Sequence, residues 1–149
     1  MKTVKPNFDT VNPHFIYDLL SGLTGLADVD EEVDKLSYVD SNNQDQVKNL
    51  IKTYLLPRYQ NGTIAYQQTI KFNLSYYLTT NAINFEEVYD SGLLPIECPK
   101  SARLFFEWIW QVYFPDENYI LRETKLHRTS NDIYEPHRIW ANNYNIKET

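Results

Sequence analysis

Residues 104–114 read LFFEWIWQVYF, and only Glu107 and Gln111 interrupt this run of apolar and aromatic side chains. A helix that is apolar on nearly every side is normally buried at the centre of a core. Pro115 should end this helix, because proline cannot continue its backbone hydrogen bonds. The run is too short to cross a bilayer, which takes about 20 apolar residues. We therefore expect a central aromatic helix over about 99–114.

Other helices are indicated by their ends. Asn12-Pro13 offers an N-cap followed by the residue type favoured at the first helical position. An apolar stripe runs through 44–55, and Pro57 should kink or end that helix. Asn84 and Glu87 have the spacing of a capping box, with asparagine in place of serine or threonine. These signals predict helices along the chain before the central one.

Residues 64–81 fit two patterns. Every second residue from Ile70 to Leu78 is apolar or aromatic, as in a strand, and the aromatic and β-branched content also favours a strand. The stretch nevertheless runs for about 18 residues without a breaker, a length typical of a helix. We favour the helix and keep the strand as the alternative.

The fold class that these patterns predict is mainly α. We expect one domain over 1–149, built as a helical bundle around the helix at 99–114, with residues 1–11 as an N-terminal arm. A minor β element is expected at most, either at 64–81 or at 118–126. The length is close to that of one ordinary domain and is enough to bury a substantial core.

Composition excludes several classes of protein. The chain has only 4 Gly and 1 Cys, which excludes collagen-like and disulfide-stapled chains. It has 14 Lys and Arg against 20 Asp and Glu, whereas non-specific nucleic-acid binding requires excess positive charge. The N-terminus lacks the apolar run of a signal peptide, and the lone Cys98 can form no internal disulfide. We therefore expect a cytoplasmic protein that binds neither nucleic acid nor a membrane.

The negative charge is concentrated in residues 28–45. This acidic segment has seven acids and one base, Lys35, whereas the rest of the chain has equal numbers of each. Such a surface favours encounter with a positively charged protein, although a solvated face without a partner is the alternative. Tyr38 lies within the segment, and interfaces are enriched in tyrosine. The predicted partner-binding residues are Asp28, Asp30, Glu31, Glu32, Asp34, Tyr38, Asp40 and Asp45.

Calcium is a poor match for the same segment. An EF-hand loop starting at Asp28 would need glycine at its sixth position and glutamate at its twelfth. These positions hold Val33 and Val39. We therefore expect no metal site there.

The histidines and the cysteine give weaker signals. His127 and His137 lie near basic residues and are the residue type that RNA cleavage uses as general acid and base, but their spacing matches no zinc pattern. Cys98 precedes the central helix, which favours a thiolate, but Glu97 opposes it, so we expect a structural thiol. No glycine-rich phosphate loop is present, and we expect no cofactor.

The function that we expect is inhibition by binding, without catalysis. An acidic single domain without catalytic motifs is typical of a bacterial immunity or antitoxin protein that neutralises a basic toxin, above all a nuclease. One alternative is a small RNA-cleaving or phosphodiester-processing enzyme that uses His127 and His137. Another is a phage-type inhibitor that imitates nucleic acid through the same carboxylates. The expected partner is a basic protein in each inhibitor hypothesis.

Overall fold

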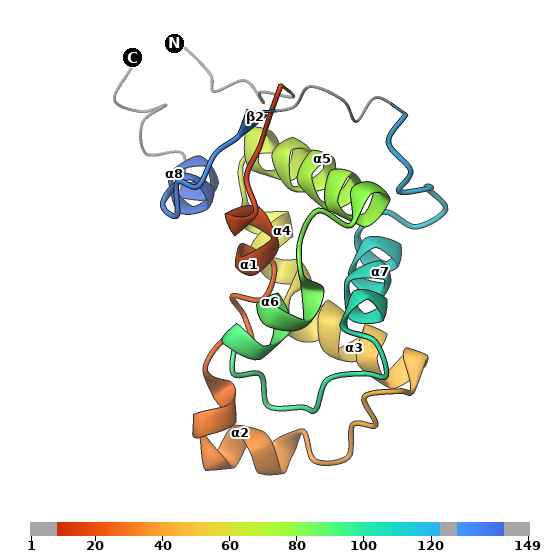
Figure 1. Ribbon diagram of the computed structural model, residues 1–149. Coiled ribbons are helices and arrows are strands. Elements are labelled where there is room, and N and C mark those ends of the chain that lie inside the picture. The colour runs from red at the N-terminus through yellow and green to blue at the C-terminus, as the bar shows by residue number, and fades with distance from the viewer. Residues whose placement is uncertain (1–8, 123–127, 142–149) are drawn as a thin grey trace.

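The central aromatic helix is α7, Ala102–Tyr113, in the computed structural model shown in Figure 1. The structure describes residues 9–122 and 128–141. Helix α7 packs against α3, α5 and α6, so it lies at the centre of the helical body as expected. It starts just after Pro99 and ends directly before Phe114-Pro115. Its buried residues are Ala102, Phe105, Phe106, Trp108, Ile109, Trp110 and Tyr113.

Helix α5, Ile64–Thr80, resolves the ambiguity over residues 64–81 in favour of a helix. It contacts α1, α4, α7 and α8, so it is covered on more than one side. Buried residues therefore occur around most of its circumference, which explains why its sequence lacks a single apolar stripe. Thr63 caps its first turn by accepting a hydrogen bond from the backbone N–H of Tyr66 at 3.0 Å.

Two other predicted helix ends are confirmed. Helix α3, Gln44–Tyr54, is followed by α4, Leu56–Asn61, with Pro57 in the first turn of α4. Helix α6, Phe85–Ser91, begins after Asn84, whose side chain accepts a hydrogen bond from the Glu87 N–H at 3.1 Å. Proline and asparagine thus mark these boundaries as helix-end chemistry predicts.

The first helix is shorter than expected, because apolar residues at helical spacing in the sequence run from Phe15 to Leu23. Helix α1, His14–Asp18, ends early, and the chain then turns until the short helices η1, Leu26–Asp28, and α2, Asp30–Lys35. Gly22 lies in these turns, and a Cβ atom there would be 1.9 Å from the Tyr54 carbonyl oxygen. The backbone of this turn therefore lies directly against the end of α3, which requires glycine.

The minor β element lies where neither alternative placed it. Strand β1, Thr10–Val11, pairs in parallel with β2, Arg128–Thr129. The strand alternative at 64–81 is wrong, because that stretch is α5. Within 118–126, residues 118–122 form no strand, and residues 123–126 lie outside the described part of the chain. The pairing joins positions far apart in the sequence, which local alternation cannot reveal.

The end of the expected N-terminal arm belongs to the folded body, because Thr10–Val11 forms β1 and Val11 is buried. The next residue, Asn12, extends this attachment. Asn12 is almost fully buried, and its backbone N–H donates to Asn73 Oδ1 at 2.8 Å. Its side-chain amide donates to the Asp132 carbonyl and to Glu135 Oε1, each at 2.9 Å. Asn12 therefore joins α5 to helix α8, Glu135–Ala141. Residues 1–8 of the expected arm lie outside the described residues.

A second polar network links α1, α4, α5 and α8. The Asp18 carboxylate accepts two hydrogen bonds from Arg58, at 2.9 and 3.0 Å, and one from the Tyr66 hydroxyl at 2.5 Å. The Arg58 guanidinium also lies 4.8 Å from the centre of the Trp140 ring. The Trp140 indole N–H donates to the Arg58 carbonyl at 2.7 Å. This network fixes α8 on the helical body.

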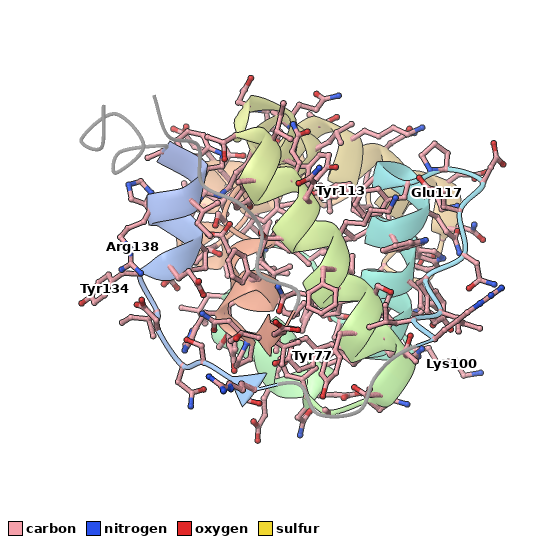
Figure 2. The ribbon with its side chains drawn as sticks, turned by 90° about the horizontal axis from the view of Figure 1, so that it is seen from above. Tyr77, Lys100, Tyr113, Glu117, Tyr134 and Arg138 are labelled. Atoms are coloured by element: carbon pink, nitrogen blue, oxygen red, sulfur yellow. The ribbon has the colours of Figure 1, made fainter. Side chains whose placement is uncertain are left out.

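Tyrosines are divided between core and surface. Figure 2 shows Tyr77 and Tyr113 within the helical body and Tyr134 at its outer edge. Tyr77 and Tyr113 are buried, whereas Tyr134 is largely exposed.

Within the described residues, the helices are all too short or too polar to span a bilayer.

Candidate protein-binding surface

The acidic segment lies at one end of the molecule. Figure 1 shows α2 and the loop 36–43 at the end opposite α8 and β2. Helix α2 buries none of its own residues; it contacts η1 and is followed by the buried Leu36. Asp30 and Glu31 lie in its first turn, where negative charge is favoured by the helix dipole. Helix α2 therefore presents the carboxylates of Asp30, Glu31 and Asp34 to solvent, whereas one oxygen of Glu32 is buried.

The predicted binding residues are nearly all accessible. Glu32 is the most covered of the carboxylates, with one oxygen 4.0 Å from the Lys35 amino group. Tyr38 is 68% exposed, so its ring is available for contact instead of being buried at the edge of the core. The exposed carboxylates are those of Asp28, Asp30, Glu31, Asp34, Asp40 and Asp45.

The loop after α2 is held in place by side-chain hydrogen bonds. Asp40 Oδ1 accepts from the backbone N–H of Asn42 at 3.0 Å, and Gln46 Oε1 accepts from the Asp40 N–H at 2.7 Å. Asn43 caps α3, and Asn42 Oδ1 accepts from the backbone N–H of Lys100 at 2.7 Å. The loop is thereby fixed both to α3 and to the connector that precedes α7.

A second acidic stretch adjoins the first. Residues 86–97 contain four acids and no base, a signal that the sequence carried but that we did not use. Backbone hydrogen bonds hold the second stretch beside the residues that directly precede the first: the Gly25 N–H donates to the Gly92 carbonyl at 2.7 Å and the Ala27 N–H to the Leu93 carbonyl at 2.9 Å. The additional acids are Glu86, Glu87, Asp90 and Glu97.

We call these two stretches, residues 28–45 and 86–97, the acidic end. Together they hold eleven acids and one base, while the remaining sequence holds nine acids and 13 bases. The chain therefore has charge of opposite sign in its two parts, instead of a neutral body with one acidic segment. A partner with a positive surface would be attracted to the acidic end and repelled by much of the rest.

A groove of about 340 Å³ lies between the loop after α2 and the connector after α6. Asp40 and Glu97 are among its lining residues. The Tyr89 hydroxyl contacts the carbonyls of Ile96 and Glu97 at 3.0 and 2.9 Å, which holds the connector in place. The apolar lining residues are Val33, Leu36, Val39, Pro95 and Ile96.

A larger hollow, of about 730 Å³, is less suited to a ligand. It is lined by residues 81–86 and Arg103, and it is wide open to solvent. The Arg103 guanidinium already donates to the Leu78 carbonyl at 2.7 Å and to the Tyr119 hydroxyl at 3.1 Å. It also lies 3.6 Å from the Glu107 carboxylate. The charge of Arg103 is thus used within the protein, so we place the candidate site at the acidic end.

The structure places only one of the two histidines proposed for RNA cleavage. His137 lies in α8 and stacks on Trp140 with ring centres 6.2 Å apart, away from the acidic end. His127 lies outside the described residues. In the described part of the chain, no three His, Cys, Asp or Glu side chains are grouped as metal ligands would be.

Cys98 lies beside the second acidic stretch. Its thiol is partly buried, and burial raises its pKa, with the negative charges of Asp90 and Glu86 acting in the same direction. A nucleophilic cysteine needs the opposite shift, because the thiolate is the reactive form. These surroundings favour a structural thiol.

The fold defines a mainly α, single-domain protein with a strongly acidic end. No protein family, curated protein or solved structure that was compared with the chain matches it.

Proposed function

We propose that this chain is a non-catalytic inhibitor that binds a basic protein through its acidic end. The proposed class is that of immunity or antitoxin proteins, the partner is a basic toxin, most simply a nuclease, and the setting is the bacterial cytoplasm. The observation that carries this proposal is the meeting of two acidic stretches, which together hold eleven carboxylic acids, along the walls of one groove.

The chemistry of nucleases explains why such a surface would inhibit them. A protein that binds the nucleic-acid backbone presents Lys and Arg side chains to its phosphates. Carboxylates displayed on a folded surface can occupy the same basic groove. Complementary charge also steers the two proteins together and raises the association rate, and this effect weakens with salt.

Two parts of the acidic end have different proposed roles. Asp30, Glu31 and Asp34 of α2 have exposed carboxylates, so they provide the charge that attracts the partner. Tyr38 is the proposed anchor, because its exposed ring can bury a large area in the partner and tyrosines often dominate interface energies.

The test is capture of the partner by tagged full-length protein from the source cell at low and high salt. Two variants with equal changes of charge are compared. The acidic-end variant carries Asp28→Asn, Asp30→Asn, Glu31→Gln and Asp34→Asn. The control variant carries Glu107→Gln, Asp116→Asn, Glu117→Gln and Asp132→Asn.

We expect the native chain and the control variant to retain one basic protein at low salt and to release it at high salt. The acidic-end variant should retain about tenfold less partner, because it lacks four of the seven carboxylates in residues 28–45. Thermal unfolding shows whether each variant is folded. Equal capture by the two variants, or a captured partner that is not basic, would contradict the proposal. A captured DNA-binding enzyme would favour the nucleic-acid mimic over the antitoxin.

A further inference from the structure

The groove at the acidic end combines two kinds of chemistry. Its apolar side chains come from both walls, with Val33 and Val39 on one side and Pro95 and Ile96 on the other. Carboxylates at Asp40 and Glu97 line the same groove. A long basic side chain has the matching parts, because its alkyl stem covers apolar surface while its charged head remains polar.

Both walls of the groove are held before any partner binds. The Tyr89 hydroxyl bonds to the carbonyls of Ile96 and Glu97 on the connector wall. On the loop wall, Asp40 Oδ1 accepts from the Asn42 N–H, and the Asn42 side chain in turn binds the Lys100 N–H on the connector. Little ordering is then required on binding, and such preorganisation favours affinity.

We propose that this groove receives a lysine side chain of the basic partner. The methylene groups lie along the apolar floor, and the ammonium group lies at the carboxylates of Asp40 and Glu97. An acidic side chain would be repelled there, and a purely apolar one would cover carboxylates without pairing them, which is costly. The inference rests on the proposed function and adds how one partner residue is recognised.

The test uses cationic peptides that differ only in the length of the side-chain stem. Hexapeptides of lysine, ornithine and diaminobutyrate carry the same charge but have progressively fewer methylene groups. Each is titrated into the isotope-labelled full-length chain, and dissociation constants are taken from the shifts of backbone amide signals. If the groove buries the stem, affinity should fall about twofold to fourfold for each methylene removed.

Two double variants with the same change of charge locate the effect. Asp40→Asn with Glu97→Gln changes the groove, and asparagine preserves the acceptor for the Asn42 N–H. Glu31→Gln with Asp34→Asn changes α2 outside the groove. Both should weaken lysine hexapeptide binding through the loss of charge, but only the groove variant should bind the three peptides with similar affinity.

The outcomes separate this inference from the function on which it rests. Equal affinity of the native chain for all three peptides would overturn the groove proposal while leaving charge-based binding by the acidic end intact. A stem-length dependence that survives in the groove variant would place the lysine site elsewhere and also overturn it. No binding of any of the peptides would count against the proposed function itself.

Discussion

Replacing Asp18 with alanine is expected to lower the free energy of unfolding by about 3 kcal/mol. The Asp18 carboxylate accepts from Arg58 through two hydrogen bonds and from the Tyr66 hydroxyl, and its side chain is only 12% exposed. Alanine would leave a largely covered guanidinium and a buried hydroxyl without their acceptor. The midpoint of thermal unfolding should fall by roughly 6–12 °C for a domain of this size.

A double-mutant cycle on Asp18 and Arg58 measures how much their interaction contributes to the free energy of unfolding, apart from the loss of either side chain alone. Arg58→Met keeps much of the stem that packs beside Trp140 and removes the buried charge. If the two side chains act as a pair, the combined variant should lose clearly less stability than the sum of the single losses. If the losses in unfolding free energy measured by chemical denaturation simply add, Asp18 and Arg58 do not stabilise the fold as a pair.

Alkaline unfolding should begin just above pH 10 and be complete between about pH 11 and 13. Burial raises the pKa of Tyr66, Tyr77, Tyr89 and Tyr113 above the ordinary value of 10.0. Below pH 10 these phenols are neutral in both the folded and the unfolded chain, so their contribution to stability is fully present. Above pH 10 the unfolded chain releases protons that the folded chain retains. Each of these tyrosines then lowers the free energy of unfolding by about 1.4 kcal/mol per pH unit. The total free energy of unfolding of a domain is only about 5–15 kcal/mol, so a few pH units are enough to unfold it.

Tyr113→Phe provides the control for alkaline unfolding. This variant should lose about a fifth of the slope of unfolding free energy against pH, because Tyr113 is one of five tyrosines with a raised pKa, the fifth being the half-buried Tyr59. Tyrosinate absorbance and circular dichroism are followed together during the titration. If all 12 tyrosines ionised near pH 10 while the helical signal stayed unchanged, the buried phenols could not have raised pKa values.

Local signals in the sequence predicted much of the helical architecture. The run at 104–114 is apolar on nearly every side, which predicted a central position, and the packing of α7 confirms this. Pro57 and Asn84 act through local backbone chemistry, which a sequence displays directly. The length of the stretch at 64–81 predicted its helix correctly, whereas its alternation of apolar residues did not. Helix α5 is covered by several neighbouring helices, so apolar residues occur around it instead of in one helical stripe.

Features that depend on distant residues were not predictable in the same way. The turn at Gly22 lies against the Tyr54 carbonyl at the end of α3, and β1 pairs with a segment over a hundred residues away. The exposed position of residues 28–45 agreed with their charge. The second acidic stretch could have been found by counting, since residues 86–97 contain no base, but its adjacency to the first depends on tertiary hydrogen bonds.

The most direct test of the central claim is the association rate constant with the captured partner, measured by rapid mixing at several salt concentrations. The acidic-end variant and the control variant change the net charge equally but at different places on the molecule. We predict that the acidic-end variant associates about tenfold more slowly at low salt and that this difference shrinks as salt screens the charges. The control variant should stay within about threefold of the native chain. Equal association rates for the two variants at every salt concentration would contradict the account.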